Sequence, residues 1–167
     1  YYQKIRTSSD NPKALNLYRD ANAECCWPQD GIEVLAPTPE LVREAEESQD
    51  YDHLSYVLRI THQGKKILLG GDATTEAWEN IIAYYGNAAL RSDVLLAPNH
   101  GSKNHITKDI LDVIQPRLTV VSVAEGVDYA YDFYSQYGTV LSTKHFGNIL
   151  VAVMDSGQIL YWTQFGE

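Results

Sequence analysis

The chain has 167 residues, enough for one domain with a substantial core and few for two. Hydrophobic residues make up 44% of it, as in folded globular domains, and no apolar run approaches the ~20 residues that cross a bilayer. The formal net charge of −9 repels phosphate backbones, so non-specific coating of nucleic acid is not expected.

The cysteines and the first residues favour a cytoplasmic protein with no membrane segment in this chain. Cys25 and Cys26 are adjacent, which strains a disulfide between them and does not make a Cys-x-x-Cys metal pair. The N-terminal sequence does not join a basic start to an apolar core, the pattern of a signal peptide. We therefore expect a reducing compartment and two free thiols.

Residues 1–31 are polar and mixed, and predict an irregular segment that leads into a fold at 32–167. Runs of β-branched residues between turn signals predict the strands, and apolar residues at helical spacing predict the helices. The expected strands are 32–35, 54–61, 66–69, 93–97, 117–123, 139–142, 148–154 and 159–163. The expected helices are 73–85 and 107–114, with a helix as one alternative for acidic 40–50 and for tyrosine-rich 128–137.

This alternation predicts an α/β (α+β) domain with one mixed sheet and helices packed on one face. The central strands are apolar on both sides, so the second face needs cover as well. The side chains of the two central strands alternate between the two faces of the sheet, and three helices can bury only the side chains of one face. One face carries Val94, Leu96, Val120 and Ser122, and the other carries Leu95, Val121 and Val123. We therefore expect a layer from outside this chain to cover one of these faces.

Two metal-competent side chains directly follow buried strands. Asp72 comes after strand 66–69, and His100 comes after strand 93–97. Because strand ends converge at one edge of an α/β sheet, we expect the carboxylate and the imidazole to face a common cleft. Such a pair suits Zn²⁺ or Mn²⁺. The simpler alternatives are a helix cap for Asp72 and an ordinary loop histidine for His100.

Four segments occur in a family-like order: SYVLRI at 55–60, ILLGGDA at 67–73, DVLLAPNHGS at 93–102 and TKHFG at 143–147. Together they resemble the second half of metallo-β-lactamase-fold hydrolases, above all the ComEC-like domain attached to bacterial DNA-uptake channels. The resemblance covers residues 32–165 and implies the C-terminal half of a four-layer αββα sandwich. It also implies a metal ligand at Asp72, in "GDA", and a histidine from the stretch that matches "HHGS".

The chain departs from the family pattern in two places. The family's His-His is Asn99-His100 here, and its His-x-(His/Asp)-x-Asp-His motif is absent. A catalytic zinc needs about three protein ligands, so the isolated chain is expected to bind zinc weakly and to be inactive. The resemblance implies two ions, Zn or Mn, in the intact protein, with the missing ligands from an upstream half or from another chain.

Several polar residues near these motifs are weaker candidates. Ser102 fits a hydroxyl that orients the His100 loop, together with Asn99. For the rest a solvated loop or surface role is the simpler alternative: His53, His105, Lys144 and His145. The tyrosines of 129–137 could stack nucleotide bases, although packing at a sheet edge also explains them.

The resemblance implies a metal-dependent hydrolase, most simply a phosphodiesterase or nuclease acting on nucleic acid or nucleotides. Fold alone does not fix the substrate. The alternative is a metal-free, non-catalytic half-domain that acts as a scaffold or an interaction subunit. A His-rich motif upstream or on a partner chain would favour the enzyme.

Overall fold

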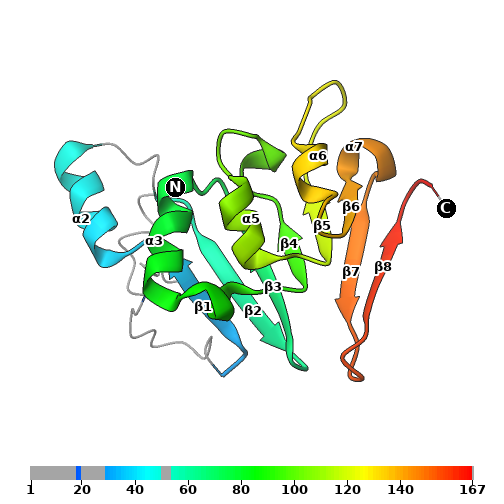
Figure 1. The fold of residues 1–167 in the computed structure, drawn as a ribbon, viewed down its shortest axis with the longest axis horizontal. Coiled ribbons are helices and arrows are strands. Elements are labelled where there is room, and N and C mark those ends of the chain that lie inside the picture. The colour runs from blue at the N-terminus through cyan, green and yellow to red at the C-terminus, as the bar shows by residue number, and fades with distance from the viewer. Residues whose placement is uncertain (1–17, 20–28, 50–53, 167) are drawn as a thin grey trace, which may run out of the picture.

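The computed structural model describes residues 18–19, 29–49 and 54–166. A six-stranded sheet in the order β1-β2-β3-β4-β5-β6 is accompanied by a two-stranded sheet of β7 and β8 (Figure 1). The first three strands pair antiparallel, and β3 to β6 run parallel. The strands are β1 (Ile32–Ala36), β2 (Val57–His62), β3 (Lys65–Leu69), β4 (Val94–Leu96), β5 (Leu118–Val121), β6 (Thr139–Ser142), β7 (Ile149–Val153) and β8 (Ile159–Thr163).

Helices join most of the strands, and none among the described residues is long and apolar enough to span a membrane. Threonine hydroxyls cap three of them: Thr38, Thr74 and Thr107 accept from the backbone N–H three residues on. The helical elements are α2 (Pro39–Ser48), α3 (Thr75–Tyr85), α4 (Asn87–Leu90), the 3₁₀ turn η1 (Pro98–Gly101), α5 (Lys108–Ile114), α6 (Tyr131–Tyr134) and α7 (Thr143–Phe146).

The predicted class, an α/β (α+β) fold with a mixed sheet, is confirmed. The expectation of a single sheet is wrong, because β7 and β8 form a second sheet. The cap at Thr107 is confirmed as well, and the acidic segment after β1 is a helix. Only one turn of the 128–137 segment is helical, and the short elements α4, η1 and α7 were not predicted. Most of the segment 1–31, including Cys25 and Cys26, lies outside the described residues.

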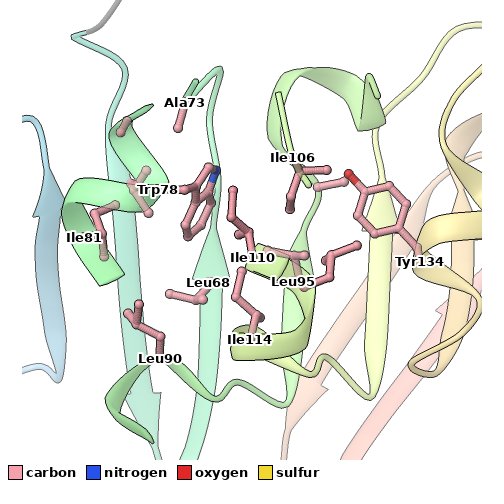
Figure 2. Close-up of a cluster of buried hydrophobic side chains, with 14 of the residues drawn as sticks. Leu68, Ala73, Trp78, Ile81, Leu90, Leu95, Ile106, Ile110, Ile114 and Tyr134 are labelled. Carbon is pink, nitrogen blue, oxygen red and sulfur yellow. The ribbon is translucent and has the colours of Figure 1, made fainter. Parts of the chain in front are cut away.

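The main core lies between the helices and one face of the sheet (Figure 2). Adjacent strands supply Leu68, Leu95 and Val121, and all three are fully buried. The helices supply the larger side chains opposite them, which are Trp78, Ile81, Leu90, Ile110, Leu111, Ile114 and Tyr134. Burial of these apolar surfaces, at ~25 cal/mol per Å², is what holds α3 and α5 against the sheet.

The hairpin of β7 and β8 covers part of the opposite face. Val94, Leu118 and Leu141 are buried there beneath side chains of the hairpin, which are Ile149, Val151 and Ile159. The expectation that only material from outside this chain covers this face is therefore wrong for its β4–β6 part. The turn α7 ends at Gly147, whose φ of 64° and ψ of −134° suit glycine, and from there the chain continues as a separate sheet.

The rest of that face is aliphatic and only half-buried. The strand registers place Ile32 opposite Ile60, and Leu58 between Val34 and Leu69. Each of these side chains is partly accessible to solvent, as are Leu96 and Val120, while Ser122 is exposed. By contrast Leu95, Val121 and Val123, on the helix side, are all buried. One face of the sheet is thus covered by the helices, and among the described residues the other face is fully covered only beneath the hairpin.

Candidate metal centre at the carboxyl edge of the sheet

The loops that carry Asp72 and His100 lie side by side. They leave the carboxyl ends of the paired parallel strands β3 and β4, where Leu69 aligns with Leu96. The Gly70 N–H donates to the Leu96 carbonyl at 3.1 Å, and the Asn99 N–H donates to the Gly71 carbonyl at 2.8 Å. Asp72 directly follows Gly71, and His100 directly follows Asn99, so each candidate is next in sequence to one partner of the Asn99–Gly71 hydrogen bond. Their convergence on a common cleft stays a prediction.

Two glycines make this close approach sterically feasible. A Cβ at Gly70 would lie 2.9 Å from the Leu96 carbonyl oxygen, inside van der Waals contact. A Cβ at Gly71, whose φ is 52°, would lie 2.6 Å from both the Ser55 hydroxyl and the Tyr56 carbonyl oxygen. Gly70 is therefore required by the packing of the two loops, and Gly71 by the approach of the Asp72 loop to Ser55 and Tyr56.

Asp72 is exposed, and its carboxylate has no hydrogen-bond or ion-pair partner among the residues that the structure describes. Its backbone N–H donates to the Ser55 hydroxyl at 2.7 Å, which fixes the loop. The alternative role as the cap of α3 does not apply, because Thr74 caps that helix. The carboxylate thus has no structural task within the described part of the chain.

His100 sits in an unusual stretch of backbone. Asn99 (φ 42°, ψ 52°) and His100 (φ 55°, ψ 27°) are consecutive non-glycine residues in the left-handed region. Such conformations cost on the order of 1–3 kcal/mol each and cluster at functional sites, although Asn and His tolerate them better than most residues. The surrounding hydrogen bonds hold this strained turn in place, including that from the Asn99 N–H.

The imidazole of His100 has a defined tautomer. Its Nδ1 lies 2.8 Å from the Ser122 carbonyl oxygen, which can only accept a hydrogen bond. Nδ1 therefore carries the proton, and in the neutral ring Nε2 keeps a free lone pair. The His100 residue is exposed at the edge of the sheet. A ring held through Nδ1 by a backbone carbonyl is the arrangement that metal-binding histidines use.

Ser102 and Ser122 support the loop in different ways. The Ser102 N–H closes the turn on the Asn99 carbonyl at 3.0 Å, and its hydroxyl accepts from the Asn104 N–H at 3.4 Å. Sequence reasoning selected Ser102 but missed Ser122, because Ser122 acts through its carbonyl. No side-chain pattern reports such a backbone contact.

The described weaker candidates lie in the loop after His100 and on α7, which follows β6 at the same edge of the sheet. His105 is half-buried, and its Nδ1 has no partner among the described residues. On α7, the Lys144 ammonium donates to the Val127 carbonyl at 3.0 Å, and His145 Nδ1 lies 3.1 Å from the Ser142 hydroxyl. His53 lies outside the described residues.

The described residues supply some of the ligands that a metal site needs, but too few for a complete site. Within the described ranges, no group of three or more His, Cys, Asp or Glu side chains is arranged to hold a metal. Asp72 and His100 offer one carboxylate and one imidazole, whereas catalytic zinc takes about three protein ligands. The donor types match Zn²⁺ or Mn²⁺, and the donor number falls short.

Comparison with known proteins gives one informative relative, and no family model matches the chain. The competence protein ComA of Neisseria gonorrhoeae is 32% identical over 101 residues. The match covers 60% of this chain and only 14% of that protein. The similarity supports the predicted relation to competence proteins, and the metallo-β-lactamase fold stays a prediction.

Proposed function

We propose that this chain is the Asp72- and His100-bearing part of a metal-dependent phosphodiesterase, a nuclease of the metallo-β-lactamase type. The observation that carries the proposal is the His100 imidazole, held through Nδ1 and presented from a strained turn beside the Asp72 loop. A histidine that merely fills a loop needs neither the left-handed backbone nor the fixed tautomer. The similarity to a competence protein favours DNA as the polymer that is cut.

In this proposal Asp72 and His100 hold one or two divalent ions, Zn²⁺ or Mn²⁺. A metal bound there would supply a water whose pKa is lowered toward neutrality. The task of this chain is to orient the two ligands: Ser122 fixes the imidazole, and Ser55 fixes the backbone at Asp72. The remaining ligands must come from elsewhere, because the described residues supply too few.

A further half of the domain would account for both the missing metal ligands and the half-buried face of the sheet. A further half of the domain, upstream in the same polypeptide or on another chain, would cover β1 to β3 and bring its ligands to the carboxyl edge. The aliphatic row on that face supports this, because apolar side chains that stay half-accessible lose part of their burial energy. The matched relative, of which this match covers 14%, is long enough to hold such a half.

A second candidate function is a non-catalytic half-domain that binds its partner through the same face. Asn99 favours it, because the resemblance places a histidine there. So does the shortage of metal ligands among the described residues. The two candidates differ in whether the completed domain binds metal.

The isolated 167-residue chain is expected to bind zinc weakly and to have no measurable phosphodiesterase activity, because two ligands make neither a closed nor a catalytic site. Metal analysis after dialysis and hydrolysis of bis(p-nitrophenyl) phosphate measure the two properties. Stoichiometric zinc that survives dialysis would contradict this expectation. It would place further ligands within the chain, with His53 and His145 as the first residues to replace.

A further inference from the structure

A cleft of about 460 Å³ lies at the sheet edge formed by β6. It opens between α6 and α7, which stand next to each other in Figure 1. We propose that this cleft binds the base of a nucleotide, with a preference for bases that carry an exocyclic amino group. Its lining residues are Asp128, Tyr129, Tyr131, Val140, Lys144 and Phe146, together with His145.

The walls of the cleft are aromatic and accessible. The rings of Tyr129 and Tyr131 meet edge to face, with centroids 6.2 Å apart and planes at 83°. Tyr131 is 51% exposed, so much of its ring surface is open to solvent. Phe146 and Val140 are half-buried and complete an apolar floor. A planar base can stack on such rings, and stacking of this kind accepts every base because each has a π-face.

The polar groups of the cleft suit a nucleotide better than an aromatic side chain of a protein. The Lys144 ammonium is held by the Val127 carbonyl at 3.0 Å and keeps donors for a phosphate oxygen. The Asp128 carboxylate lies 3.9 Å from that ammonium and is fully exposed. A carboxylate accepts hydrogen bonds from the amino groups of adenine, guanine and cytosine, and thymine offers no such group.

The position of the cleft connects it to the candidate metal centre. The Ala130 N–H, between the two tyrosines, donates to the carbonyl of Gly101 at 2.9 Å. Gly101 directly follows His100 and packs so closely that a Cβ there would lie 3.1 Å from the Tyr129 Cβ. The Tyr129 wall of the cleft therefore packs against the turn that carries His100. The use of the cleft as a subsite rests on the proposed phosphodiesterase function, whereas base binding itself does not.

The net charge of the chain limits the ligand to a short one. At −9, the molecule repels a long phosphate backbone, and the cleft offers a single well-placed lysine against it. A mononucleotide, or the end of a single strand, brings few phosphate charges close to the protein and is therefore repelled less. We therefore assign the cleft to one base of a single-stranded substrate.

The test is calorimetric titration of the 167-residue chain with deoxyribonucleoside 5′-monophosphates in EDTA, which removes metal binding from the measurement. We expect the adenine, guanine and cytosine nucleotides to bind and the thymine nucleotide to bind more weakly. Tyr131→Ala should weaken binding at least about fivefold through lost stacking, and Tyr131→Phe should restore it. Asp128→Asn should remove the preference for amino-bearing bases.

Tyr161→Ala is the matched control, because Tyr161 is 46% exposed and lines a different cavity. Equal weakening by Tyr161→Ala, full binding by Tyr131→Ala, or no binding of any nucleotide would overturn the base site. The proposed metal chemistry is tested separately by zinc retention, so failure of one does not imply failure of the other.

Discussion

Replacing Asp72 with Asn in the completed domain, this chain together with the half that supplies the remaining ligands, is expected to lower phosphodiester hydrolysis more than ~100-fold. Loss of a group that merely supports a metal ligand costs 10–100-fold in metal affinity or activity, and loss of a ligand itself should exceed that. Asparagine keeps the shape of the side chain and removes its charge. Steady-state hydrolysis of single-stranded DNA at saturating Zn²⁺ or Mn²⁺ measures the effect.

Asp155→Asn is the control for this experiment, because Asp155 is an exposed carboxylate in the β7–β8 turn. It should leave activity unchanged. Asp72→Asn should also leave the unfolding midpoint unchanged, since Asp72 is exposed and Thr74 caps α3. An Asp72→Asn protein that keeps full activity would remove Asp72 from the metal site.

Replacing Trp78 with Ala is expected to destabilise the chain by about 3–5 kcal/mol, the usual cost of removing a large aromatic side chain from a core. Trp78 is fully buried between α3 and the sheet, beside Leu68 and Ile110 (Figure 2). Its indole N–H has no hydrogen-bond partner among the described residues, so the loss is one of packing. Urea unfolding, followed by far-ultraviolet circular dichroism, measures the change.

Glu79→Ala, one residue further along α3, is the control for the core substitution. Glu79 is exposed, and alanine is the better helix former, so stability should stay within about 0.5 kcal/mol of the parent. A Trp78→Ala chain as stable as the Glu79→Ala chain would show that α3 does not pack on the sheet as described.

Local chemistry made much of the fold predictable. Each strand of the six-stranded sheet is a run of β-branched and aliphatic residues, and Thr107 marks the start of α5 by a side-chain hydrogen bond to Ile110. The neighbouring positions of the Asp72 and His100 loops followed from the rule that strand ends converge at one edge. These features depend on short stretches of sequence, so the residue pattern of each stretch is enough to predict them.

The parts that were missed depend on contacts distant in sequence. The strands of the 148–163 hairpin are apolar on both faces, and this pattern does not say whether the hairpin extends the first sheet or packs across it. The left-handed turn at Asn99 and His100 is held by Gly71 and by the Ser122 carbonyl. Backbone contacts of this kind leave no trace in the side-chain pattern, so the sequence predicted the residues of the candidate site and not their conformation.

Zinc retained after dialysis by the completed domain tests the central claim most directly. The claim is that Asp72 and His100 are metal ligands whose site is completed by residues outside this chain. We expect this chain, once combined with the half that supplies the remaining ligands, to retain stoichiometric zinc, and both the Asp72→Asn, His100→Asn double variant of that completed domain and the isolated chain to lose it. A double variant that keeps its zinc, or a completed domain that holds none, would contradict the account.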